Sequence, residues 1–180
     1  HFGVGLVKTP SNFGSLGESP SHPELLDWLT SEFIARGLSL KSLHRQIMTS
    51  ATYQLSGNYD EHSYQADSDN RLYWRMSPRR MDVEAWRDSI LFVTGELDSS
   101  LGGPGYLDAK ESMRRTLYAK VSRNGDVFAS DDFLRLFDFP AMRSSVEQRP
   151  SSLVPPQFLF LMNSQFMIDR TKSFVSRLSK

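Results

Sequence analysis

The sequence predicts a mainly α protein: a compact helical domain with a helix pair near the N-terminus, a long C-terminal helix and at most a small β element. Apolar residues recur at helical spacing in several stretches. Twelve Phe and three Trp supply large side chains for a core, and 180 residues suffice to bury them. We expect one helical domain over residues 1–180. Because the chain opens on His1 without a Met, we also expect a fragment of a larger multidomain protein.

The strongest helix signals lie near the N-terminus. Ser21 followed three residues later by Glu24 has the pattern of a capping box, and Pro23 is tolerated in a first turn. Gly37 can take the left-handed conformation that ends a helix, and Ser39 can cap the next one. We expect a packed pair of helices over 22–36 and 40–52, with these side chains buried: Leu25, Leu29, Phe33, Leu43 and Ile47.

The remaining elements follow from local patterns. The polar stretch 54–69 predicts a loop, and alternation over 116–122 predicts a strand. A short helix is expected over 131–137 and a long helix over 156–178. The apolar residues of the long helix serve either as core or as a face that docks on a neighbouring domain. Another helix is expected from Val83 to Leu97, with Asp82 as its N-cap and with a buried face of Val83, Trp86, Ile90, Val93 and Leu97.

Composition and motifs argue against several classes of function. The formal net charge is zero, which is unusual for a nucleic-acid-binding protein, and no apolar run approaches the roughly 20 residues of a membrane span. There is no cysteine, and neither His22 nor His44 has a histidine four residues on, so we expect no metal site. The stretch that begins at Asp67 fails the calcium-loop pattern and predicts an Asx-capped turn. We find no catalytic motif and expect no cofactor in this chain.

One group of charged residues forms a candidate ligand site for an anion. Guanidinium groups bind carboxylate, sulfate or phosphate with paired hydrogen bonds. The alternative is internal pairing with nearby acids, which the balanced charge of the chain favours. The residues of this site are Arg71, Arg75, Arg79 and Arg80.

Short sequence motifs shared with one type of protein domain run through most of the chain. They cover residues 1–7, 9–14, 16–29, 39–41, 43–45, 49–53, 69–75, 79–81, 84–85, 87–88, 101–103, 137–138, 149, 151–152, 154–155, 157 and 161–163. In these motifs the chain resembles a planctomycete-type domain of unknown function, which lies at the C-terminal end of large exported proteins that begin with a cytochrome-c-like segment. The Asn-Arg and Trp that precede the His-Phe-Gly in that family are absent here, so we expect a truncated first element.

The resemblance implies an extracytoplasmic location, periplasmic or secreted, and a multidomain parent. Its implied partners are the other domains of that parent, a cytochrome-c-like domain among them. It implies no mechanism. Our first hypothesis is therefore a non-catalytic accessory or interaction module.

The alternative hypothesis is a part of a carbohydrate-active or sulfated-glycan-handling enzyme, or a glycan-binding module, with an anionic polysaccharide as partner. Glycoside cleavage needs two carboxyl groups that face each other about 5–10 Å apart. Acids that could serve are Glu18, Glu24 and Glu84, and Trp28, Trp74 and Trp86 could stack on sugars. Trp28 and Trp86 lie on amphipathic helices, which favours burial in the core for both.

Overall fold

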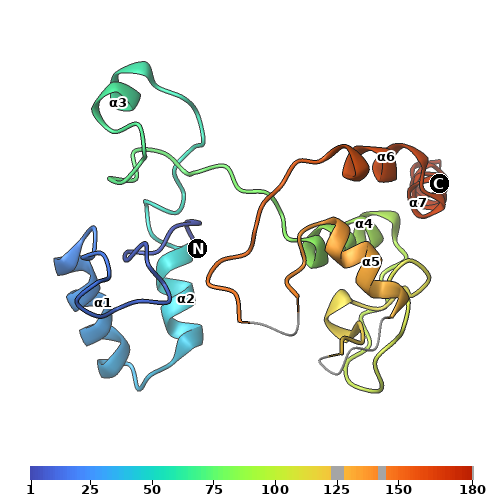
Figure 1. Cartoon of the computed structure of the whole chain (residues 1–180), viewed down its shortest axis with the longest axis horizontal. Helices are drawn as coiled ribbons and strands as arrows, with labels where there is room; N and C mark the ends of the chain where they lie inside the picture. Colours follow the sequence, from blue (N-terminus) through green and yellow to red (C-terminus); the bar gives the residue numbers. More distant parts are fainter. Residues whose placement is uncertain (123–127, 142–144, 180) are drawn as a thin grey trace. The chain divides into compact units, whose positions relative to one another are not determined.

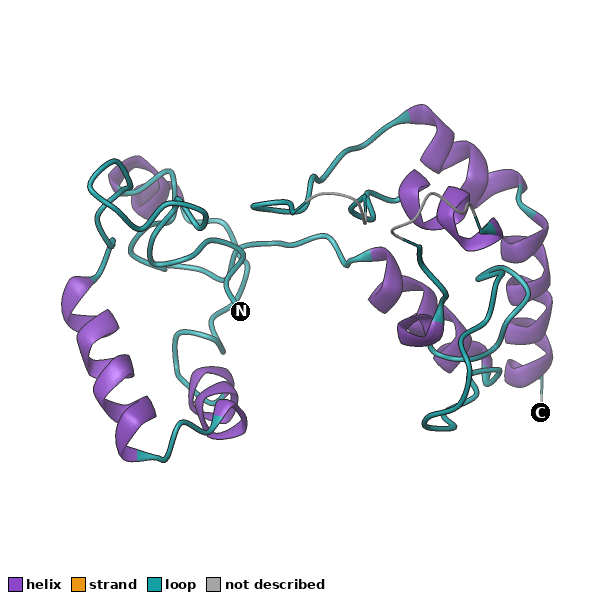
Figure 2. Ribbon diagram, turned by 60° about the horizontal axis from the view of Figure 1, so that its bottom comes forward, coloured by secondary structure: helices purple, strands orange, loops and turns teal. Residues whose placement is uncertain are grey.

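The computed structural model of the chain describes residues 1–122, 128–141 and 145–179. Over these residues the secondary structure is helical and no strand is formed (Figure 2). The mainly α fold class is therefore confirmed. Within the single domain predicted over residues 1–180, contacts cluster into two compact units, His1–Arg79 (unit 1) and Arg80–Lys180 (unit 2), and we describe each by itself.

Unit 1 contains the predicted helix pair, α1 (Pro23–Ala35) and α2 (Leu40–Met48), which lie side by side (Figure 1). The chain reverses between them at Gly37, whose φ of 70° falls in the left-handed region that glycine tolerates best. The Ser39 hydroxyl then accepts a hydrogen bond of 3.3 Å from the N–H of Ser42, as expected for an N-cap.

The predicted capping box at the start of α1 is wrong. The helix begins at Pro23 with His22 as its N-cap, and no side chain accepts a bond from the helix end. The Ser21 hydroxyl lies 2.9 Å from Nδ1 of His22 instead. The N–H of Ser21 donates to the carbonyl of Leu6 at 2.8 Å, which ties this residue to the N-terminal arm rather than to the helix.

Burial between α1 and α2 is weaker than predicted. Neither helix buries a residue completely, and Leu25 remains 39% exposed. The four other side chains of the expected interior, Leu29, Phe33, Leu43 and Ile47, are half-buried. Two helices alone cannot enclose their own contact, because a helix pair needs a further layer to exclude water from its edges.

The stretch 54–69, predicted as a loop, contains a short helix, α3 (Glu61–Ala66). Asp60 caps it by accepting a 2.8 Å hydrogen bond from the N–H of Ser63. After the helix, the Asp67 carboxylate accepts bonds from the N–H groups of Arg71 and Leu72 at 2.9 and 2.8 Å. The Asx-capped turn predicted in place of a calcium loop is therefore confirmed.

Unit 2 is built on α4 (Val83–Thr94) and α7 (Gln165–Leu178), which pack against each other. Gly95 ends α4 with a φ of 77°, and the Arg177 guanidinium donates to the carbonyls of Phe92 and Val93 at 2.9 and 2.8 Å. A cation at this position stabilises the end of a helix, where carbonyl groups lack partners.

A compact apolar core lies in unit 2, where α5 (Ala129–Leu136) and α6 (Pro155–Asn163) join these helices. Its fully buried members are Val83, Ala109, Phe133 and Leu134. Aromatic rings then close around Phe133, with centroids 5.3 to 6.3 Å away: Trp86, Phe137, Phe160 and Phe166.

The buried face of α4 differs from the one predicted. Val83, Arg87, Leu91 and Thr94 are buried, whereas Val93 is 49% exposed. These four positions follow helical spacing, but an arginine occupies the second of them, so a search for apolar residues alone selects a rotated face. The helix also ends before the predicted Leu97.

Two further predictions for unit 2 are wrong. The strand expected over 116–122 is a 3-10 turn, η1 (Thr116–Tyr118), followed by a single bridge between Tyr106 and Ala119. The long helix expected over 156–178 is divided at Ser164, which ends α6 and caps α7 by accepting a bond from Met167. The short helix expected at 131–137 is confirmed as α5.

Candidate functional site

The four arginines of the candidate anion site are engaged in separate local contacts. The guanidinium carbon of Arg75 lies 4.7 Å from the ring centroid of Trp74. Arg71 donates its backbone N–H to Asp67, and the side chain of Arg79 lies against Gly3. These three belong to unit 1, whereas Arg80 is the first residue of unit 2. Anion binding by the four arginines therefore stays a prediction.

Arg80 takes part in a polar network of unit 2. Its guanidinium donates to the Ser152 carbonyl, to Oδ2 of Asp138 at 3.4 Å and to Oε1 of Gln157 at 3.2 Å. Asp138 also accepts from the N–H and hydroxyl of Ser152 at 2.9 and 2.6 Å. Although its desolvation acts in the opposite direction, these bonds and the Arg80 charge lower the pKa of Asp138. Arg80 thus follows the alternative of internal pairing.

The surroundings of Arg71 are balanced in charge. A hollow of about 280 Å³ in unit 1 is lined by Lys8 and Arg71, but also by Glu18 and Asp69. An anion site needs an excess of cationic groups, because nearby carboxylates repel the ligand. This hollow therefore gives little support to the binding of sulfated glycans.

Two residues of the carbohydrate hypothesis, Glu84 and Trp86, are engaged in other contacts. Glu84 forms two hydrogen bonds with Arg149, at 2.9 and 2.8 Å. Desolvation of Glu84 acts to raise its pKa, but the Arg149 bonds, a backbone hydrogen bond and the Arg149 charge together lower it. The Trp86 ring stacks on Phe137 with centroids 5.0 Å apart, so this tryptophan belongs to the core region as predicted. Trp28 is 50% exposed, and its predicted burial is wrong.

Trp28 instead lines an apolar groove of about 400 Å³ in unit 1. Residues of α1, the end of α2 and the N-terminal arm form the walls, with Leu25, Ile47 and Phe2 among them. Ligand pockets are mostly apolar with a few polar groups that orient the ligand. At this groove those polar groups include His1, at the rim where the arm meets α2.

Two histidines that are 43 residues apart in sequence meet at this rim. Nε2 of His1 lies 2.7 Å from Nδ1 of His44, and the ring centroids are 4.9 Å apart. The edge of the Tyr53 ring supports both His1 and Phe2, with centroids at 5.9 and 5.7 Å. The sequence offered no signal for this pair, because a search by helical spacing compares only residues that are close in the chain.

The buried Arg87 of α4 was also missed. It donates to the carbonyls of Ala109 at 2.6 Å, of Arg114 at 2.9 Å, and of Ser112. It also lies 3.1 Å from the hydroxyl of Thr116, so it fixes the loop over 109–116 against the helix. A side chain that is 0% exposed and bonded to backbone carbonyls has a structural role rather than a catalytic one.

The outer face of α6 is apolar and uncovered. Phe158, Leu159 and Met162 are 53%, 59% and 76% exposed. The opposite face of α6 packs against the rest of unit 2. Gln157 is buried there and donates to the carbonyl of Leu136 at 2.9 Å, and Phe160 packs against the core. The sequence of the helix, PPQFLFLMN, contains no charged residue. A helix that is apolar all round is typically buried on all sides.

Two features are absent from the described parts of the chain. No group of three or more His, Asp or Glu side chains in those parts could hold a metal ion. Among the described helices, none is both long and apolar enough to cross a bilayer.

Comparison with known proteins gives one match. The model of the PSD1 family, described as a protein of unknown function (DUF1553), covers residues 1–180. No curated protein and no solved structure matches the chain.

Proposed function

This chain belongs to the PSD1 family of proteins of unknown function, and from that premise we propose that it is a non-catalytic accessory module that docks on another domain of a larger exported protein. The observation that carries the proposal is the outer face of α6, formed by Phe158, Leu159, Leu161 and Met162. We call these four residues the α6 face.

The composition of the α6 face supports docking rather than exposure to water. A contiguous apolar patch on a soluble domain typically marks an interaction site. Burial of apolar area contributes roughly 25 cal/mol per Å², so large side chains such as Phe158 and Met162 supply much of the driving force for association. The neighbouring helix α7 differs, because it carries Asp169, Lys172 and Arg177 and has a solvated side.

The α6 face is also held in place before any partner binds. Gln157 accepts from the N–H of Val154 at 3.4 Å and from Arg80 at 3.2 Å, which anchors the first turn of the helix. The N–H of Gln157 donates to the carbonyl of Val154 at 3.0 Å at the same end. A preorganised surface loses less conformational entropy on binding, which favours a docking role.

The resemblance described above adds the identity of the partner to this proposal. Domains of that type lie at the C-terminal end of exported proteins, so the partner is another domain of the same polypeptide, a cytochrome-c-like domain among the candidates. An extracytoplasmic location is part of the same proposal.

The test is the binding of this chain to the rest of its parent protein, produced separately, by isothermal titration calorimetry. The double variant Leu159→Lys/Met162→Glu should weaken binding at least tenfold and leave thermal stability unchanged. The control Leu117→Lys alters a residue of η1 that is 72% exposed, and it should leave binding unchanged. Equal binding by the wild type and the double variant would contradict the proposal. So would a result in which the α6 face mediates self-association of the chain, or its adsorption to lipid vesicles, and the rest of the parent protein is not bound.

A further inference from the structure

We propose that His1 and His44 of unit 1 form a binding site for a square-planar divalent transition metal ion, Cu(II) in the first place. This site is independent of the docking role of the α6 face. Its basis is the pair of imidazole nitrogens, Nε2 of His1 and Nδ1 of His44, that face each other at 2.7 Å.

The two nitrogens lie close enough for both to bind one ion. Imidazole nitrogens bind such ions at about 2.0–2.1 Å, so two nitrogens at a right angle around one ion lie about 2.9 Å apart, and two at a tetrahedral angle lie about 3.4 Å apart. The observed 2.7 Å is a hydrogen-bond distance and is shorter than both values, so the rings must separate by about 0.2 Å for a right angle and by about 0.7 Å for a tetrahedral one. Tetragonal coordination by nitrogen and oxygen is the preference of Cu(II) and Ni(II), whereas Zn(II) prefers a tetrahedron.

The protonation states needed for binding are accessible without loss of a proton. In the metal-free pair one imidazole donates its N–H to the other. When the ion enters, the donor ring moves its proton to its other nitrogen, so that both facing nitrogens are neutral ligands. Those other nitrogens are Nδ1 of His1 and Nε2 of His44, and neither has a partner among the described residues. Both side chains are exposed, so each of these N–H groups can donate a hydrogen bond to water.

The surroundings hold the pair together while leaving room for the ion. Phe2 fixes the arm by packing between Tyr53 and Tyr73, with ring centroids at 5.7 and 5.0 Å. Gly3 follows with a φ of 88°, a conformation that other residues rarely adopt. Both histidines lie at the surface, so water completes the coordination sphere and the few tenths of an ångström needed for opening require no rearrangement of a core.

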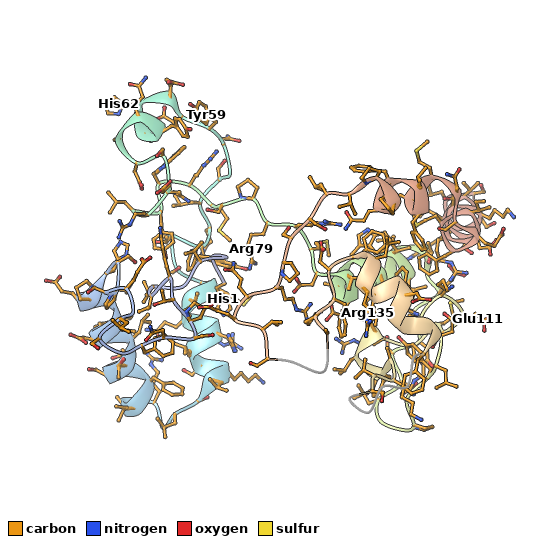
Figure 3. The ribbon with its side chains drawn as sticks, in the orientation of Figure 1. His1, Tyr59, His62, Arg79, Glu111 and Arg135 are labelled. Carbon is orange, nitrogen blue, oxygen red and sulfur yellow. The ribbon has the colours of Figure 1, made fainter. Side chains whose placement is uncertain are left out.

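Two other histidines of unit 1 provide matched controls. His22 is engaged by the hydroxyl of Ser21 at 2.9 Å and stacks on Tyr73. His62 lies on α3, well away from His1 (Figure 3). Neither has a second imidazole at ligand distance among the described residues.

The experiment titrates CuSO₄ into the full chain, carrying several residues ahead of His1 so that no free α-amino group contributes. We expect one Cu(II) per chain, with electron paramagnetic resonance showing hyperfine coupling to two imidazole nitrogens, and an affinity order of Cu(II), Ni(II), Zn(II). His1→Ala and His44→Ala should each weaken binding at least tenfold, and His22→Ala and His62→Ala should leave it unchanged.

Other results would overturn the site. Coupling to fewer than two nitrogens in the wild-type spectrum would do so without reference to any variant. Equal affinity of the His44→Ala variant, or loss of binding in His62→Ala, would show that copper binds elsewhere. Far-UV circular dichroism of each variant without metal verifies that it is folded, and His44→Asn repeats the test where an alanine variant is unfolded.

Discussion

Residues 80–180 close around buried apolar side chains, whereas residues 1–79, all of them described, bury one residue completely, and that residue is the polar Asn70. In unit 2 the ring of Phe133 meets four other aromatic rings. In unit 1 the aromatic contacts, such as that of Phe2 with Tyr73, are only half-buried. The two halves of one family domain therefore rely on different interactions.

The Asn70 side chain shows how unit 1 compensates for its lack of buried apolar side chains. Its amide donates to the carbonyl of Arg75 and to the hydroxyl of Ser77, both at 2.8 Å, and accepts from the N–H of Arg75 at 3.3 Å. Its φ of 52° is left-handed, which asparagine tolerates better than most residues. Polar bonds of this kind each contribute about 1 kcal/mol, less than a buried aromatic ring. We infer that unit 1 opens more easily than unit 2.

The largest effect should come from Arg87→Met in unit 2. The substitution leaves the buried carbonyls of Ala109 and Ser112 without a donor, and we expect a loss of about 3–5 kcal/mol in the free energy of unfolding, measured in urea. The control is Arg115→Met, because Arg115 is 47% exposed beside Asp88 and should cost less than about 1 kcal/mol. Equal losses for the two variants would refute a bracing role for Arg87.

A direct comparison of the two units uses a leucine from each. Leu134→Ala should cost about 2–5 kcal/mol, because Leu134 is 1% exposed and its removal leaves a cavity. Leu29→Ala in α1 should cost clearly less, since Leu29 is half-buried beside an open groove into which water can enter. Chemical denaturation monitors both. A cost for Leu29→Ala as large as that for Leu134→Ala would mean that unit 1 has a core of its own.

Asn70→Ala should cost about 1–3 kcal/mol, because it leaves buried backbone groups of the turn over 70–77 unpaired. Hydrogen exchange should show the loss as faster exchange confined to unit 1. Asn58→Ala, at an exposed position, should change nothing. Protection that is unaltered in the Asn70 variant would contradict the role assigned to this side chain.

A smaller effect concerns pH. The folded pKa of Asp138 is lowered, so its contribution to stability is fully present above the unfolded pKa of about 4 and is lost as pH falls through the folded pKa. Asp138→Asn should therefore flatten the acid side of the stability curve of unit 2, measured by fluorescence of Trp86 in a background where Trp28 and Trp74 are replaced by Phe. Asp82→Asn, in an exposed position, is the control. An acid slope that is identical in the Asp138 variant and the wild type would exclude this origin.

The smallest effect should come from Ser21→Ala, with a change of less than about 0.5 kcal/mol in thermal unfolding. The Ser21 hydroxyl contacts His22 and not the helix end, so the loss of about 1 kcal/mol that accompanies removal of a true N-cap should not occur. Ser39→Ala, which removes a true cap, should cost that amount. A loss of about 1 kcal/mol at Ser21 would restore the capping box.

Local signals predicted α1 and α2 well because turns and caps are encoded within a few residues, as at Gly37 and Ser39. They did not predict the face of α4, because the residue buried there is Arg87, whose partners come from a loop about 25 residues away in the chain. The His1–His44 pair is more remote still. Contacts between distant segments depend on how the elements pack, and periodicity within one element carries no information about that packing.

Ser164 makes the corner between α6 and α7 from one residue, and this has a consequence for length variation in the chain. An inserted or deleted residue in α7 would turn every later side chain by about 100° around the helix axis. Phe166 and Arg170 would then leave the sites where they contact Phe133 and Glu96. Length should therefore vary least at this corner among related chains, and a tag or reporter should be tolerated far better near Gly57 and Asn58, in an exposed turn of unit 1.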